Sequence, residues 1–146
     1  MTSQSTTPES VAKVLIVDTQ KRGLVLTLGK HLKYPEKSFL PDLPGGIVDA
    51  GESELSAVIR ETKEECGITI DAKSIQLAYA QTTYHAEENK SVSKLLYIAH
   101  INDSPKVTLS WEHSDYKWIP LDELKYVALR PFFKGAIEYS LTNKLL

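Results

Sequence analysis

The sequence predicts an α/β fold in which a mixed β-sheet is covered by helices on both faces. Apolar, β-branched segments typical of strands occur before, between and after segments with helical periodicity. The chain has 146 residues, the usual length of one domain. Hydrophobic residues make up 42% of it and charged residues 25%, close to the average for a globular domain that builds its own core.

The expected elements follow one another with short connections. The expected strands lie at residues 11–18, 24–28, 75–84, 92–101 and 116–119. The expected helices lie at residues 53–66, 121–126 and 131–143, the last of which opens on a proline. Residues 29–44 are expected to be irregular because three prolines interrupt them. Residues 1–10 are expected to form a disordered tail, which leaves residues 11–146 as a single domain.

Charge and cysteine content exclude several classes of function. With 17 basic and 19 acidic residues, the formal charge is −2, which gives no reason to expect binding to nucleic acid. The single cysteine, Cys66, excludes a disulfide within the chain. No apolar run approaches the roughly 18 residues of a membrane-spanning helix, and no secretory or organellar signal is recognisable. We therefore expect a cytoplasmic protein that acts on a small molecule.

The helix at residues 53–66 carries signals at both ends. Ser53 is a good N-cap, and Glu54 suits the positive end of the helix dipole. Gly67 follows the last helical residue, where a left-handed cap is favoured. Between these ends, one apolar stripe has spacings of three and four and must face a core. Its members are Leu55, Val58, Ile59, Thr62 and Cys66.

The other side of this helix is acidic. Glu61, Glu64 and Glu65 stand at positions i, i+3 and i+4, where like charges repel by a few tenths of a kcal/mol per pair. Three carboxylates that converge on an open surface suit a hard cation such as Mg²⁺ or Mn²⁺. Ahead of the helix, Gly45 can turn the backbone sharply and present a carbonyl oxygen. The alternative is a solvated acidic helix face without a ligand.

The spacing of residues 46–68 resembles the signature of the Nudix hydrolase family. That signature is Gly, five residues, Glu, seven residues, Arg-Glu, an apolar residue, any residue, Glu-Glu, any residue, Gly and an apolar residue. The matching positions are Gly46, Glu52, Arg60, Glu61, Glu64, Glu65, Gly67 and Ile68. One position departs from the signature, because Thr62 stands where the family has an aliphatic residue. Thr keeps the β-branched shape, so the departure concerns the packing of the helix more than its chemistry.

The resemblance implies a Nudix fold, an α/β/α sandwich, and a set of roles within the motif. By similarity, the metal ligands are the Gly45 carbonyl and the three glutamates of the helix, Glu61, Glu64 and Glu65. Arg60 is expected to pair with Glu61 or Glu52 and to hold the rotamer of its partner. Glu52 is expected to support the loop before the helix or a metal-bound water.

Further candidates lie outside the motif. Glu112 stands six residues before Trp118 on a segment where family members carry an acidic residue, so the resemblance implies that it completes the metal site or acts as general base. The alternative is a solvated carboxylate, in which case Glu87 or Glu88 takes the base role. Tyr84 lies 17 residues after Gly67, where the family associates a Tyr with dinucleoside polyphosphate hydrolysis. Phe39 and Tyr34 are the other candidate platforms for a base.

The resulting prediction is a metal-dependent pyrophosphohydrolase. It would cleave the diphosphate linkage of a nucleoside diphosphate derivative by attack of water at phosphorus, with Mg²⁺ or Mn²⁺ as cofactor. The substrate could be a nucleoside triphosphate, a dinucleoside polyphosphate or a nucleotide sugar. Two alternatives use the same scaffold, a catalytically silent nucleotide-sensing module and a diphosphate isomerase. A homodimer is compatible with the family, and nothing in the sequence decides it.

Overall fold

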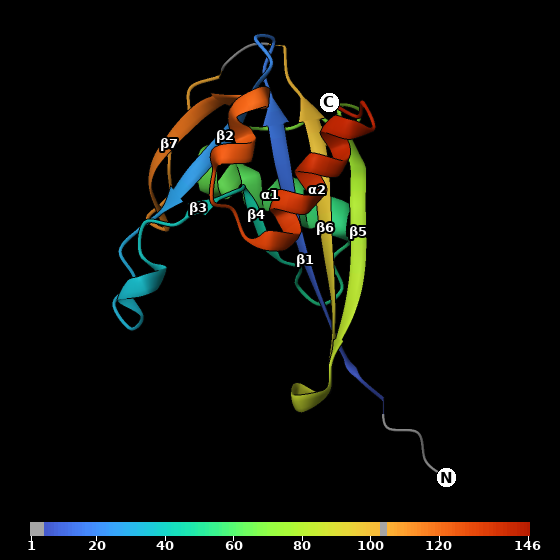
Figure 1. Ribbon diagram of the computed structural model, residues 1–146. Helices are drawn as coiled ribbons and strands as arrows, with labels where there is room; N and C mark the ends of the chain where they lie inside the picture. The colour runs from blue at the N-terminus through green and yellow to red at the C-terminus, as the bar shows by residue number, and fades with distance from the viewer. Residues whose placement is uncertain (1–4, 103–104) are drawn as a thin grey trace.

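The computed structural model of the chain describes residues 5–102 and 105–146, and they form the expected layered α/β fold (Figure 1). The strands are β1 (Thr7–Val17), β2 (Arg22–Leu28), β3 (Pro41–Asp42), β4 (Gly45–Ile47), β5 (Ile75–His85), β6 (Lys90–His100) and β7 (His113–Pro120). The α-helices are α1 (Glu54–Cys66) and α2 (Pro131–Thr142). Three short 3₁₀ helices are η1 (Pro35–Lys37), η2 (Ala86–Glu88) and η3 (Leu121–Tyr126). None of the helices described is both long and apolar enough to span a membrane.

All of these strands belong to one mixed sheet. Its main path runs β3-β2-β1-β6-β5, with β4 paired to β1 and β7 paired to β2. β1 and β6 run parallel, while the other pairs are antiparallel. The long strands β5 and β6 form a hairpin, and β1 pairs with β6 along its whole length, so these three strands extend beyond the others (Figure 1).

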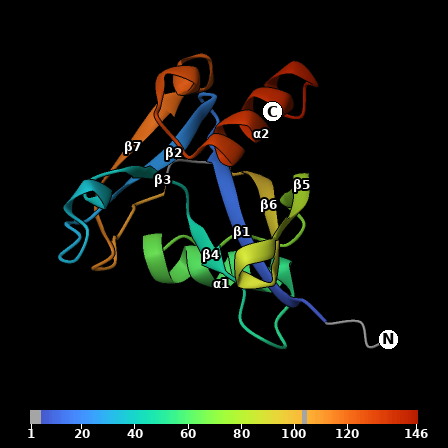
Figure 2. The ribbon, with the colours of Figure 1, turned by 60° about the horizontal axis from the view of Figure 1, so that its bottom comes forward.

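The two α-helices cover opposite faces of the sheet, and the central strand supplies both cores (Figure 2). On β1, Val14 and Ile16 are fully buried in the cluster that contains Val58 and Cys66 of α1. The alternate residues, Leu15 among them, are buried in the cluster that contains residues of α2. A strand covered on both faces is apolar at consecutive positions instead of alternating, which explains the apolar run along this strand.

The expected ends of α1 are confirmed. The Ser53 hydroxyl accepts a hydrogen bond from the backbone N–H of Ser56 at 3.1 Å, and Gly67 ends the helix with φ at +75°. Thr62 is fully buried, and its hydroxyl donates to the carbonyl of Val58 at 2.6 Å. The polar atom at this departure from the family pattern therefore has a partner, so packing is preserved.

The structure corrects two expectations about the first part of the chain. Residues 7–10 belong to β1 and not to a disordered tail, because they pair with β6 from Lys90 onward and Glu9 lies 3.2 Å from the Lys90 ammonium. Residues 1–4 of the expected tail lie outside the described residues. Short strands β3 and β4 also occupy a segment that begins in the region expected to be irregular. Strands of two and three residues have too little pattern to be found locally; partners distant in sequence define them.

Candidate active site

Strand β4 lies directly against the acidic side of α1. Gly45 has φ at +123°, and a Cβ there would collide with the carbonyl oxygen of Ala12, so the position accepts only glycine. Its N–H donates to the Glu65 carboxylate at 3.0 Å. At the next residue, Gly46, a Cβ would lie 3.8 Å from the Glu61 carboxylate. The two glycines therefore let the backbone approach two carboxylates of the helix closely.

The sequence led us to expect that the three glutamates of α1 share one open surface, but in the structure they do not. The side chain of Glu65 is 3% exposed and that of Glu61 21%, whereas that of Glu64 is 58% exposed. Residue i+4 is rotated by about 40° from residue i in one direction around the helix, and residue i+3 by about 60° in the other direction. Glu61 and Glu65 therefore face β4, and Glu64 lies nearer to solvent beside Arg60.

Arg60 ties the loop before the helix to the carboxylates. Its Nε and one terminal nitrogen donate to the two oxygens of Glu52 at 2.7 and 2.8 Å, in a bidentate pair. The same guanidinium lies 3.1 Å from Glu64 and 3.4 Å from Glu61. This pairing holds the pKa of Glu52 below its usual value. Arg60 thus meets both partners expected of it, and it restrains Glu61 from the side away from β4.

Removal from solvent disfavours the charged form of the two inner carboxylates, despite the Arg60 guanidinium beside Glu61. Burial raises the pKa of Glu65 to about 8, although the N–H of Gly45 opposes the shift. Burial also raises the pKa of Glu61, and the negative charges of Glu64 and Glu112 add to the effect. Carboxylates that resist ionisation in this way are stabilised as anions by a cation between them. With the Gly45 carbonyl nearby, the donor set consists of oxygens and fits Mg²⁺ or Mn²⁺.

Glu112 reaches this site from a distant part of the chain. It directly precedes β7, and its backbone carbonyl accepts the N–H of Gly29 at 2.9 Å, which fixes the loop. Its carboxylate is close enough to raise the pKa of Glu61. The rival residues Glu87 and Glu88 lie in η2 at the tip of the β5–β6 hairpin, where Glu88 faces Lys90 at 3.5 Å. The arrangement therefore favours Glu112 over its rivals as a neighbour of the acidic helix.

A buried polar network under the site was not recognised from the sequence. His113, the first residue of β7, has a side chain 1% exposed, and its Nε2 lies 3.0 Å from Asp42. The other oxygen of Asp42 accepts from the Lys13 ammonium at 2.8 Å. Nδ1 of His113 faces Glu65 at 3.8 Å. Asp42 and Lys13 carry no signal in the sequence, since neither belongs to a motif and only the strand pairing brings them together.

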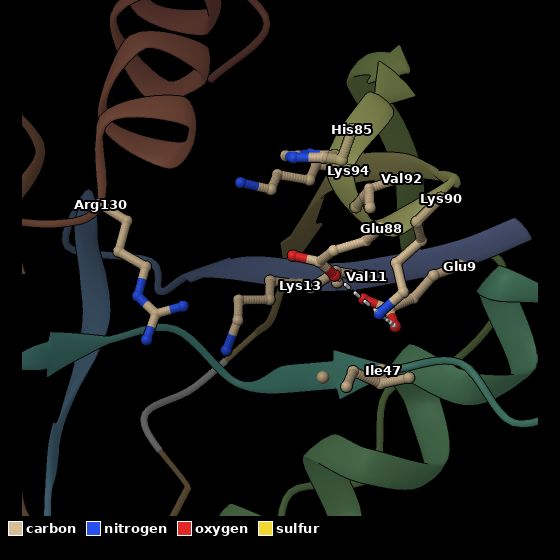
Figure 3. A pocket seen from close by; sticks show the side chains of 11 residues that line it. Glu9, Val11, Lys13, Ile47, His85, Glu88, Lys90, Val92, Lys94 and Arg130 are labelled. Carbon is tan, nitrogen blue, oxygen red and sulfur yellow. Dashed lines mark ion pairs between the residues drawn. The ribbon is translucent and has the colours of Figure 1, made fainter. Parts of the chain in front are cut away.

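Two hollows border the acidic site, one at Gly46 and the other at Glu112. The first, which we call the hairpin pocket, has about 410 Å³ and lies between β4 and the β5–β6 hairpin (Figure 3). It is lined by Glu9, Val11, Lys13, Gly46, Ile47, His85, Glu88, Lys90, Val92, Lys94 and Arg130. The second, which we call the loop pocket, has about 440 Å³ and is lined by Leu28, Gly29, Lys30, His31, Lys37, Trp111, Glu112 and Arg130.

Arg130 is the residue that the two pockets share. It immediately precedes α2, and Figure 3 shows its side chain extending into the hairpin pocket. Among residues 5–102 and 105–146, no carboxylate forms an ion pair with its guanidinium. Trp111, in the loop pocket, is 89% exposed. Sequence reasoning missed both residues because their roles depend on neighbours from other elements.

The three aromatic residues expected to hold a base are exposed, and Tyr84 lies in a different part of the fold from the other two. Tyr84 lies near the tip of the β5–β6 hairpin, where its hydroxyl donates to Asn89 at 3.2 Å. Phe39 and Tyr34 lie in the loop that follows β2. The ring of Tyr34 has the Lys37 ammonium 4.7 Å from its centre, which connects it to the loop pocket. Their roles in substrate binding stay predictions.

Comparisons with known proteins agree with this architecture. The model of the NUDIX domain family matches residues 7–139. The asymmetrical bis(5'-nucleosyl)-tetraphosphatase of Caenorhabditis elegans is 33% identical over 114 residues, which cover 78% of this chain and 81% of the relative. The corresponding protein of Sus scrofa is 35% identical over 96 residues, which cover 65% of each chain.

Solved structures give the same result. A MutT protein from Methanosarcina mazei Go1 has a TM-score of 0.76 at 26% identity, over 97% of this chain and 99% of that one. A binary complex of a C. elegans Ap4A hydrolase has a TM-score of 0.63 at 28% identity, over 93% of this chain and 99% of that one. The chain therefore belongs to the Nudix family and is a Nudix pyrophosphohydrolase.

Proposed function

We propose that the protein hydrolyses a dinucleoside polyphosphate at one of its diphosphate linkages, with Mg²⁺ or Mn²⁺ as cofactor. The observation that carries the proposal is the pair of basic pockets that border the acidic site, one at Gly46 and the other at Glu112. The relatives named asymmetrical bis(5'-nucleosyl)-tetraphosphatases support the same substrate class.

Charge explains why two pockets favour a substrate with two ends. The hairpin pocket has two more cationic than anionic side chains, and so has the loop pocket, in a chain whose formal charge is −2. A linear polyphosphate with a nucleoside at each end extends in both directions from the bond that is cleaved. It can fill both pockets, and the exposed ring of Trp111 offers a stacking surface in one of them. A substrate with a single nucleoside would leave one pocket empty.

The chain's own residues would divide the chemistry as follows. Glu61, Glu65 and the Gly45 carbonyl would hold the cation, with Glu112 or Glu64 completing the oxygen set. When bound, the cation supplies Lewis acidity and neutralises phosphate charge.

The remaining roles belong to groups around that oxygen set. Glu112 would take the proton from the water that attacks phosphorus, because it reaches the site from the open side. The Arg60–Glu52 pair keeps Glu61 in place.

The test is a substrate panel with mass analysis of the products in ¹⁸O-labelled water. Diadenosine tetraphosphate, diadenosine triphosphate, ATP and ADP-ribose are each incubated with Mg²⁺, with Mn²⁺ and with a chelator. We expect the tetraphosphate to be cleaved with the highest kcat/KM, one product to carry a single ¹⁸O, and the chelator to stop turnover. Faster cleavage of ATP would contradict the proposed substrate class. Binding without turnover would indicate a sensing module, and rearrangement without label would indicate an isomerase.

A further inference from the structure

We propose that His113, together with Asp42 and Lys13, is a positioning group that holds Glu65 and the Gly45 carbonyl at the separation a divalent cation requires. The inference rests on the proposed function, because it takes Glu65 and Gly45 as cation ligands. It adds three residues to the site that neither the motif nor the neighbouring pockets assign to this task.

His113 is placed between two carboxylates. Its Nε2 lies 3.0 Å from Oδ2 of Asp42, within hydrogen-bond distance, and its side chain is 1% exposed. Nδ1, the other ring nitrogen, lies 3.8 Å from Oε2 of Glu65 and has no hydrogen-bond partner among the described residues. Buried polar atoms without a partner are rare in folded proteins. A shift of a few tenths of an ångström would bring Nδ1 and Oε2 into hydrogen-bond distance.

The contacts of His113 belong to a ring of five residues, in which only the approach of Nδ1 to Glu65 is not a hydrogen bond. Asp42 accepts from the Lys13 ammonium at 2.8 Å, and the same ammonium lies 3.4 Å from the carbonyl oxygen of Gly45. The N–H of Gly45 donates to Oε1 of Glu65 at 3.0 Å, and Oε2 of Glu65 faces His113. The ring therefore contains both expected cation ligands, Glu65 and Gly45. It joins β1, β3, β4, α1 and β7, so these elements must be in register for the ligands to meet.

The same side chains could instead hold a metal ion themselves, because ligand atoms of Asp42, Glu65 and His113 lie within 4.8 Å of one another. The charges argue against this. One oxygen of Asp42 faces the Lys13 ammonium and the other faces His113, so neither is free for a cation. Positioning explains the contacts without displacing any of them.

The test compares His113→Gln and Asp42→Asn with the wild-type protein, and His100→Gln with both as a matched control. His100 is exposed at the end of β6. A glutamine at position 113 can still reach Asp42 with its amide nitrogen but has nothing in the place of Nδ1. Mn²⁺ affinity is measured from the electron paramagnetic resonance signal of free Mn²⁺, and the melting temperature is measured in a chelator.

We expect His113→Gln and Asp42→Asn each to weaken Mn²⁺ binding by about 10- to 100-fold, as is usual when a group that orients a metal ligand is removed. Because the two residues act through one contact, the loss of Mn²⁺ affinity in the double variant should be smaller than the product of the two single losses. Excess Mn²⁺ should restore turnover in both. His100→Gln should bind Mn²⁺ like the wild type.

Two results would overturn the inference, and they can be told apart. If the wild type binds Mn²⁺ and both variants bind it equally well while melting at a lower temperature, the ring is only structural and the proposed function stands. If the wild type binds no Mn²⁺, the proposed function fails and this inference fails with it. Should His113→Gln not fold, Asp42→Asn decides alone, because Asp42 is partly exposed and the change preserves its shape.

Discussion

The acidic site on α1 and the basic pockets beside it are constructed in opposite ways. The carboxylates of Glu61 and Glu65 are four residues apart on one helix and have fixed partners, the Arg60 guanidinium and the Gly45 N–H respectively. The pockets draw their cations from segments that are distant in sequence, and four of these cations form no ion pair among the described residues: Lys30, Lys37, Lys94 and Arg130. The difference suggests that the acidic site is held ready for one chemistry, while the pockets can adapt to a substrate.

Loss of the proton acceptor should lower the turnover number more than any other change. Glu112→Gln should lower kcat by roughly 10² to 10⁴ if Glu112 is the general base, with a smaller change in KM. The matched control, Glu123→Gln, changes an exposed carboxylate of η3 and should leave kcat unchanged. Steady-state kinetics over a range of pH are the measurement, and the acidic limb should flatten in the variant. An unchanged kcat would transfer the role to Glu87 or Glu88.

Loss of a cation ligand should come next. Glu65→Gln keeps the shape of the side chain and its bond from the Gly45 N–H, but it removes the charge. We expect kcat to fall by about 10² or more, because a ligand is lost. The exposed Glu138→Gln of α2 is the control. Equal activity in the Glu65 variant would show that the buried carboxylate is structural.

The same carboxylate should give the metal-free protein a characteristic dependence on pH. Burial raises the pKa of folded Glu65 to about 8 from an ordinary 4.5, so between these values the folded state binds a proton that the unfolded state has released. Stability is therefore greatest below about pH 4.5 for this group and is lost as the pH rises through about 8. Differential scanning fluorimetry in a chelator should show a steeper fall for the wild type than for Glu65→Gln. Parallel curves would contradict the assignment.

The helix that carries the carboxylates should depend on its cap. Gly67→Val should lower the free energy of unfolding by about 1–2 kcal/mol, because a β-branched residue resists φ at +75° and its Cβ would lie 3.3 Å from Thr108. Activity should fall with it, since Glu64 and Glu65 lie in the last turn. Gly135→Ala in α2 meets no neighbour and is the control; we expect it to be neutral or stabilising. Urea titration measures both, and equal stability of the Gly67 variant would exclude a strained cap.

The smallest effect should come from the pockets. Arg130→Ala should lower kcat/KM for diadenosine tetraphosphate by about three- to tenfold more than for ATP, because one exposed guanidinium contributes modestly to phosphate binding. Lys73→Ala removes an exposed cation before β5, outside both pockets, and should change neither value. A uniform loss on both substrates would mean that Arg130 does not distinguish a substrate with two ends.

Much of the fold followed from local patterns. The long strands and both α-helices lie where periodicity predicted them, and the caps of α1 at Ser53 and Gly67 are as expected. These features depend on hydrogen bonds and side-chain contacts between residues a few positions apart. The start of β1 at Thr7 and the short strands β3 and β4 were missed, because only pairing with a distant strand makes them regular.

The residues of the candidate site also fall into two groups, those that local patterns predicted and those that only distant contacts bring together. The sequence by itself determined the acidic helix, its pairing with Arg60 and the glycines of β4, because helical geometry and the absence of a Cβ act locally. The tertiary structure alone decided that Glu64 turns away from Glu61 and Glu65, that Glu112 comes close, and that Arg130 joins two pockets. It also brought Lys13, Asp42, Gly45, His113 and Glu65 together. These residues share no spacing along the chain; only the register of the sheet against α1 sets the distances between them.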